Sequence, residues 1–198
     1  MKEETRCESC GKETQPFTSI LFGSMEKGYR NLCLACYNAS FAEDMGLNFD
    51  HVDFAPIKLT DVAGEEHEFH FAARLLGDKV SLEALEIKDG IPRGYHFQVI
   101  GSNPEGEPLV LFKELYERMR RALSQKHLDN DDDYGPHISN EGIARGRIDI
   151  DLDDSEGDRK PLMVIDGKEI SWQEFGRMLL EYEGWNFKIE IFDRSEER

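Results

Sequence analysis

Polar and apolar residues alternate through the middle of the chain, and this pattern predicts a series of β-strands. Apolar side chains recur at every second position within residues 67–76 and again within residues 95–100. A period of two is typical of strands that bury one face. Turn signals at Gly64, at Gly77-Asp78 and at Asp89-Gly90 separate the runs. Because these connections are short, we predict a four-stranded antiparallel meander that begins near Ala55.

After the meander, the spacing of apolar residues changes to that of a helix. Pro108 is suited to a first helical turn, and Leu111, Leu115 and Met119 follow at intervals of four residues. A second helix is predicted near the C-terminus, where Ser171 and Glu174 have the spacing of a capping box. Each helix has one apolar stripe, so both should pack against a sheet.

A final strand is predicted after the second helix. Residues 185–191 alternate between apolar and polar types, and the apolar members are Trp185, Phe187, Ile189 and Ile191. A short strand, a tight turn at Asp166-Gly167 and a return strand precede the helix. The order of these elements predicts a β-α-β unit.

These patterns predict the α+β class, with a small zinc finger followed by an antiparallel-sheet domain that has two main helices. We expect a zinc-binding domain over residues 1–50 and an α+β domain over residues 51–198. Within the larger domain, the meander and its helix occupy 55–127 and an acidic loop lies near 129–142. The β-α-β unit occupies 143–193.

The segment from residue 129 to residue 158 is strongly acidic. Aspartates alternate in two places, as expected of a calcium loop, but the glycine and the closing glutamate of an EF-hand are missing from both. Around Ile148 and Ile150 the acids alternate with apolar residues, which predicts a half-buried strand with a solvated acidic face. We leave open whether the segment binds a cation.

The strongest chemical signal is a group of four cysteines near the start of the chain, which are its only cysteines. Cys7 and Cys10 form one C-x-x-C pair, and Cys33 and Cys36 form a second pair. Two such pairs supply the four thiolates of a tetrahedral zinc site. Disulfides and a redox pair are the alternatives. The charged residues 1–6 contain no apolar run of a signal peptide, so we expect a cytoplasmic protein with reduced thiols.

The residues around the cysteines predict the finger itself. Residues 17–22 and 29–32 favour two short strands, and residues 34–45 favour a helix that ends at Gly46. A cysteine knuckle, a hairpin and a helix in this order resemble the treble-clef zinc finger. The C-x-x-C-G-K and L-C-x-x-C-Y sequences are similar to the zinc domain of the ClpX unfoldase family, although no ATPase motif follows.

From the cysteine pairs we expect one structural Zn²⁺ held by Cys7, Cys10, Cys33 and Cys36. The run from Pro161 to Asp193 looks like the closing part of an uncharacterised bacterial protein family, which implies no activity.

Composition weighs against two classes of partner. Forty-one acidic and 24 basic residues give a net charge of −17, which repels nucleic acid and anionic lipid. No apolar run has the length of about 18 residues that a membrane span needs. Another protein is therefore the expected partner, and Phe17, Ile20 and Phe22 of the hairpin are the expected contact residues.

No catalytic residues are predicted, because the chain carries none of the common catalytic motifs. The favoured function is a non-enzymatic interaction or regulatory module with a structural zinc. The alternative is an enzyme or nucleic-acid-processing factor with an unrecognised acidic site in the α+β domain. A cleft containing buried acids and His96 or His137 favours this alternative, as does a divalent metal away from the cysteines. A direct nucleic-acid reader ranks third.

Overall fold

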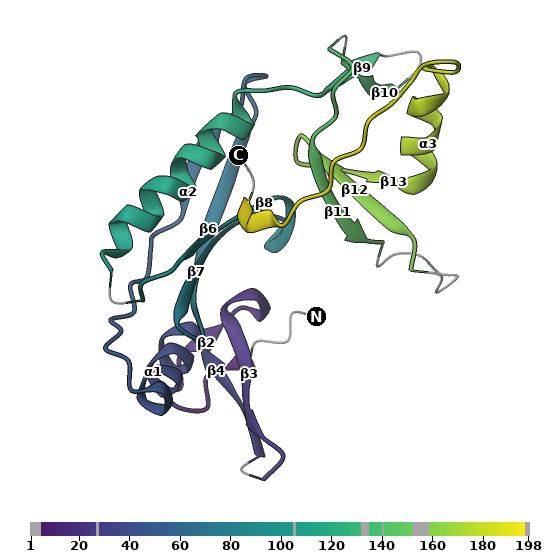
Figure 1. Cartoon of the computed structure of the whole chain (residues 1–198). Coiled ribbons are helices and arrows are strands. Elements are labelled where there is room, and N and C mark those ends of the chain that lie inside the picture. Colours follow the sequence, from purple (N-terminus) through teal and green to yellow (C-terminus); the bar gives the residue numbers. More distant parts are fainter. Residues whose placement is uncertain are drawn as a thin grey trace.

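The computed structural model describes residues 5–26, 28–104, 106–131, 135–139, 141–151 and 159–196. This part of the chain contains three α-helices and several antiparallel sheets, so the expected α+β class is confirmed. Three units follow one another along the chain (Figure 1). They are the cysteine finger, a central four-stranded sheet with one long helix, and a C-terminal unit. No helix in the described ranges combines the length and apolar character of a membrane span.

The central sheet is the predicted meander. Its strands are β5 (Ile57–Thr60), β6 (Glu66–Leu76), β7 (Lys79–Lys88) and β8 (Ile91–Gly101), in that order and all antiparallel. Helix α2 (Pro108–Leu123) crosses one face, with proline in its first turn as expected. Phe69, Leu82 and Phe97 from the sheet meet Leu115 and Met119 from α2 in a buried core. The apolar residues that alternate along the strands and those that recur at helical spacing along α2 thus form the two surfaces that pack together.

The finger contains the predicted hairpin and helix, together with a short two-stranded ribbon. Its elements are β1 (Thr5–Arg6), β2 (Glu13–Thr14), the 3₁₀ turn η1 (Pro16–Thr18), β3 (Ser19–Ser24), β4 (Gly28–Cys33) and α1 (Leu34–Met45). Gly46 ends α1 in the left-handed conformation, with a φ of 65°. This conformation is accessible to glycine at little cost, which explains why the helix stops there.

Helix α1 covers a sheet edge that β5 leaves open. β5 pairs with β6 only from Glu66 to Phe69, so the remainder of this edge of β6 needs other hydrogen-bond partners. The fully buried Asn38 side chain accepts from the Leu75 N–H at 2.9 Å and donates to the Ala73 carbonyl at 2.8 Å. The Tyr37 hydroxyl donates to the Leu75 carbonyl at 2.9 Å. These side chains replace the missing strand and join the finger to the sheet.

The C-terminal unit is a three-stranded sheet with one helix. Strands β11 (Gly146–Ile150), β12 (Pro161–Ile165) and β13 (Lys168–Ser171) are antiparallel in that order. Ser171 and Glu174 form the predicted capping box at the start of α3 (Trp172–Leu180). A turn of 3₁₀ helix, η2 (Arg194–Glu196), follows near the end of the chain.

Two expectations about the C-terminal region differ from the structure. Part of the expected acidic loop forms a hairpin, β9 (Leu128–Asp131) with β10 (Gly135–Ile138), because Leu128 and Ile138 enter a small core. Residues 132–134, which belong to the expected loop, and the acidic positions 152–158 lie outside the described residues. In β11, the exposed fractions of Ile148 and Ile150 are 57% and 50%, so this strand buries its apolar face less than expected.

The predicted final strand is wrong. Residues 185–193 pair with no strand in the described part of the chain and run past β11 toward η2 (Figure 1). Their apolar side chains are exposed, from 52% at Phe192 to 86% at Phe187. Alternation indicates a strand only where a sheet edge and an apolar surface receive it, and this segment has neither.

Replacing Asn38 by alanine should destabilise the protein through the sheet edge. The change leaves the Leu75 N–H and the Ala73 carbonyl without partners in a buried place, which should lower the free energy of unfolding by about 2–4 kcal/mol. Urea unfolding followed by circular dichroism measures this. Glu43→Ala, at an exposed site of α1, is the control and should change stability by less than about 0.5 kcal/mol. An unchanged midpoint for Asn38→Ala would show that the edge contact contributes nothing.

Candidate functional site

The structure brings all four cysteines together. Cys7 and Cys10 lie in the knuckle between β1 and β2, Cys33 ends β4, and Cys36 lies in the first turn of α1. Their sulfur atoms all lie within 4.8 Å of one another, and Cys10 Sγ is 3.8 Å from Cys33 Sγ. Zinc–sulfur bonds of about 2.3 Å place the sulfurs of a tetrahedral site about 3.8 Å apart. The four residues therefore fit a metal ion such as zinc.

Backbone hydrogen bonds shape the knuckle that presents the first pair. The Cys7 N–H donates to the Lys12 carbonyl at 2.9 Å, and the Gly11 N–H donates to the Cys7 carbonyl at 2.8 Å. Gly11 has a φ of 74°, which explains the glycine directly after the C-x-x-C pair. The Glu8 carboxylate accepts from the Asn31 N–H at 2.8 Å and ties the knuckle to β4. Both pairs are thus fixed in position by the surrounding chain.

The protonation of the four thiols favours a bound cation. Burial alone would raise the pKa of Cys7, but the backbone N–H groups of Cys33, Cys10 and Ser9 lower it to about 6. Burial raises the pKa of Cys36 to about 12 and also raises that of Cys33. One thiolate forms easily, whereas further thiolates would repel it at close range. Because no pair is bridged as a disulfide, a divalent cation is the natural way to hold four thiolates here.

The hairpin residues expected to contact a partner lie mostly on the inner side of the finger. Phe22 packs edge-on against Tyr37 at 5.3 Å between ring centroids, and Ile20 joins the same core. Phe17 meets His70 of β6 at 6.0 Å. All three side chains are half-buried. Leu21 and Tyr29 have exposed fractions of 68% and 55%, and Met25 at the turn of the hairpin reaches 94%.

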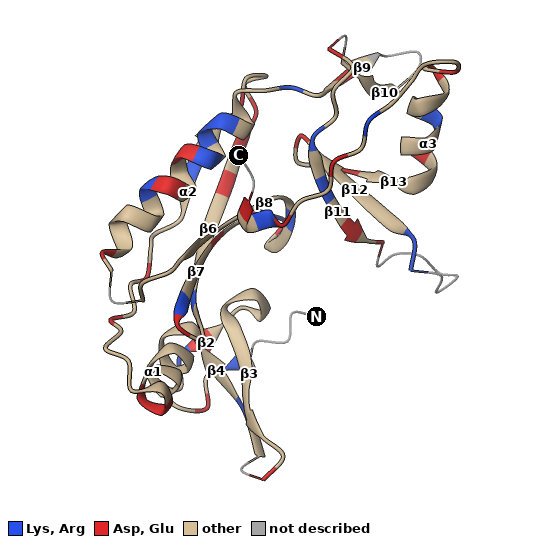
Figure 2. Ribbon diagram, in the orientation of Figure 1, with Lys and Arg blue, Asp and Glu red and all other residues tan. Residues whose placement is uncertain are grey.

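A cavity of about 670 Å³ lies between the central sheet, α2 and the C-terminal unit. Its lining includes five arginines and four acids, although acids outnumber bases 41 to 24 in the chain. The five are Arg118, Arg121, Arg145, Arg147 and Arg194. Figure 2 shows basic residues on the second half of α2, on β11 and at η2, around this space.

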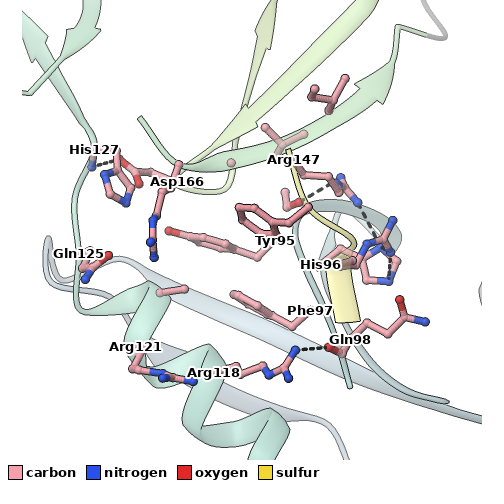
Figure 3. A pocket seen from close by; sticks show the side chains of 18 of the residues that line it. Tyr95, His96, Phe97, Gln98, Arg118, Arg121, Gln125, His127, Arg147 and Asp166 are labelled. Atoms are coloured by element: carbon pink, nitrogen blue, oxygen red, sulfur yellow. Dashed lines mark hydrogen bonds between the residues drawn. The ribbon is translucent and has the colours of Figure 1, made fainter. Parts of the chain in front are cut away.

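His96 is the centre of the polar wall of this cavity. Its Nε2 lies 2.9 Å from Glu83 Oε2, while its Nδ1 lies 3.1 Å from Arg147 Nη1 and 2.7 Å from Arg194 Nη1. Burial and the positive charges of Arg194 and Arg147 lower the pKa of His96, against the opposing effect of Glu83. Two guanidinium groups therefore converge on a neutral ring, and Figure 3 shows that of Arg147 beside His96.

The acids of the lining are engaged in bonds of their own. Glu83 accepts from His96, and Asp166 accepts the N–H groups of His127 and Leu128, both at 2.7 Å. Asp193 accepts from the Ser195 N–H at 2.9 Å. Figure 3 shows Arg118 and Arg121 on the α2 side of the cavity, Arg147 and Asp166 opposite, and Tyr95 and Phe97 between them. Acids outside the lining also pair with two of the arginines, Arg118 with Glu114 at 2.9 Å and Arg147 with Asp149 at 3.0 Å.

Sequence reasoning found the four cysteines but missed this cavity. Its arginines come from segments far apart in the chain and have no common spacing, so no local signal marks them. His96 was named as a residue that could line a cleft, and it does, whereas His137 is not among the lining residues. The alternative function predicted a site built mainly from acids, whereas arginines are the most numerous charged residues in this lining.

Three family models match successive parts of the chain, and each describes a domain of unknown function. DUF7685 matches residues 6–48, DUF7686 matches residues 50–124 and DUF7713 matches residues 127–196. Their limits coincide with the finger, the central sheet with α2, and the C-terminal unit. No curated protein and no solved structure matches the chain.

Substituting one cysteine should remove the metal. Cys33→Ser deletes one thiolate, so the affinity for zinc should fall at least tenfold, while Ala39→Ser adds a serine at an exposed site of α1 and should leave it unchanged. Elemental analysis and competition with a chelator measure this. For the unchanged chain we expect one zinc, and the cobalt-substituted form should show intense thiolate charge-transfer bands. A metal-free chain with a native finger, or one with disulfides, would contradict the site.

Proposed function

We propose that the chain is a non-enzymatic interaction or regulatory module with one structural Zn²⁺ in a treble-clef finger. The observation that carries the proposal is the closed set of four cysteine ligands, held by a knuckle, a hairpin and a helix. Four thiolates leave no coordination position for a substrate, which is typical of structural zinc. Reduced cysteines also agree with a cytoplasmic setting.

The finger's hairpin supports a role in binding another protein. It extends away from the central sheet (Figure 1), and Leu21, Met25 and Tyr29 present apolar surface to solvent there. Exposed apolar side chains on a rigid element are typical of protein interfaces. Ile20 and Phe22 pack in the core of the finger behind this surface, and Phe17 lies in the turn before the hairpin. We propose that the exposed edges of all three add to the contact surface. The partner is proposed to be a protein with a complementary apolar surface.

Polar substitutions on the hairpin should abolish partner binding without unfolding the finger. Leu21→Ser with Tyr29→Ser removes exposed apolar area, so a protein that the unchanged chain captures should no longer be retained. Quantitative pull-down of zinc-loaded protein measures this. Leu179→Ser with Leu180→Ser, at exposed positions of α3, is the matched control. Equal capture by both double variants would contradict the hairpin as the docking surface.

A second candidate function is the binding of a small anion in the arginine-rich cavity, either for regulation or for catalysis. The specific observation is the convergence of Arg147 and Arg194 on neutral His96, together with a buried Arg147 Nε that makes no hydrogen bond. Arg147 also pairs with Asp149 at 3.0 Å, so the anion would bind mainly to the groups of Arg194 and Arg147 that face His96. Arginine side chains that converge at one place are favourable sites for phosphate or carboxylate ligands. This candidate keeps the alternative of an enzyme, but with an arginine-rich site in place of an acidic one.

Inorganic phosphate should bind the unchanged chain and raise the pKa of His96, because the anion offsets the nearby arginine charges. Nuclear magnetic resonance titration of the histidine ring measures this. Arg121→Gln changes a cavity residue and should weaken binding several-fold. Arg120→Gln, on the adjacent residue outside the lining, is the control. A His96 pKa that does not change when phosphate is added, or equal phosphate binding by the two variants, would contradict anion binding in this cavity.

A further inference from the structure

A second group of metal-ligand side chains lies at the turn between β5 and β6, far along the chain from the cysteines. Asp61, Glu65 and His67 offer two carboxylates and one imidazole, and the ligand atoms all lie within 4.8 Å of one another. The Glu65 N–H donates to Asp61 Oδ1 at 2.8 Å, and the Asp61 N–H donates to the Glu65 carbonyl at 2.9 Å. The turn is anchored to α2 by the Val62 N–H, which donates to the Leu123 carbonyl at 2.9 Å. The backbone thus holds the group in place.

A buried carboxylate orients His67. The imidazole Nδ1 lies 2.7 Å from Glu86 Oε1, and both side chains have an exposed fraction of 1%. Glu86 also accepts from the Tyr95 N–H at 2.7 Å and pairs with Lys88 at 3.0 Å. The Glu86 contact fixes the ring so that Nε2 points toward the turn.

The Nε2 atom of His67 is buried and makes no hydrogen bond. It lies 3.5 Å from Asp61 Oδ2, which is an ion-pair distance at the outer limit of a hydrogen bond. Buried polar atoms nearly always have a partner, so an unsatisfied ring nitrogen beside two carboxylates calls for an explanation. A cation bound between these groups supplies one.

We propose that Asp61, Glu65 and His67 bind a divalent first-row transition metal ion, with Glu86 supporting His67 from behind. One imidazole nitrogen and two carboxylate oxygens suit manganese, iron or zinc. A carboxylate that accepts from the second nitrogen of a metal-binding histidine is a common supporting contact. The charges also balance, because three carboxylates and Lys88 sum to −2 when His67 is neutral.

This site goes beyond the structural role proposed for the cysteines. Three protein ligands leave coordination positions for water or a small ligand, which four thiolates do not. The competing explanation is a protonated His67 that bridges Glu86 and Asp61 as an ion pair. Burial would lower the pKa of His67, but Glu86 and Asp61 together raise it. A proton and a metal ion compete for Nε2, so a metal titration separates the two explanations.

The test is a titration of the zinc-loaded full chain with Mn²⁺, in which electron paramagnetic resonance counts the free ion. Manganese prefers oxygen and nitrogen ligands and should not displace zinc from thiolates. We expect one Mn²⁺ bound per chain in addition to the zinc. Asp61→Asn keeps an oxygen that accepts the hydrogen bond of the turn but loses the negative charge. The affinity of this variant for Mn²⁺ should fall at least tenfold. Glu65→Gln, whose side chain is exposed, should weaken binding in the same direction.

The matched control is Glu66→Gln, which changes an exposed acid on the adjacent residue that pairs with Lys58. It should bind Mn²⁺ as the unchanged chain does. Absence of specific Mn²⁺ binding, or binding that is equal in all three variants, would overturn the proposal and leave the ion pair as the explanation. Because the cysteine site stays filled with zinc throughout, a negative result does not affect the first metal site.

Discussion

The structure depends on the contact of Asn38 with the open edge of β6. A sheet edge presents unpaired N–H and carbonyl groups, which must be covered or solvated. The Asn38 amide serves both the Leu75 N–H and the Ala73 carbonyl, and Tyr37 serves the Leu75 carbonyl. Both side chains belong to α1, whose first turn carries Cys36 and follows Cys33. The proposed zinc therefore fixes the helix that completes the sheet, and the finger becomes part of the larger fold.

This coupling changes the meaning of the four cysteines. A finger tethered by a flexible linker could be lost without effect on the sheet. Here a loss of the metal would release α1 and expose the edge of β6, in addition to unfolding the knuckle. The hairpin β3–β4 remains free to meet a partner, because α1 makes the contact with the sheet. The contact with the sheet and the proposed partner surface thus lie on different parts of the finger.

Elements specified by local sequence were predicted well. The cysteine spacing, the meander, the proline at the start of α2 and the capping box at Ser171 each act within a few residues. Features made by distant residues could not be predicted. The partners of Asn38 in β6 lie 35 and 37 residues away, and the arginines of the cavity lie on separate segments. Asp61, Glu65 and His67 are close in sequence, but their role depends on Glu86, which lies 19 residues beyond His67.

The failure at residues 185–193 has a related cause, since alternation describes a side-chain pattern and cannot supply the neighbouring strand.

The most direct test of the coupling is hydrogen exchange at the Leu75 amide, with and without a zinc chelator. This N–H donates to Asn38 and lies outside the four-cysteine cluster. We expect removal of the metal to speed its exchange strongly, while amides in the core of the sheet, such as that of Leu82, remain protected. Protection of Leu75 that persists after complete removal of the metal would contradict the account, because the metal would then not hold α1 on the sheet.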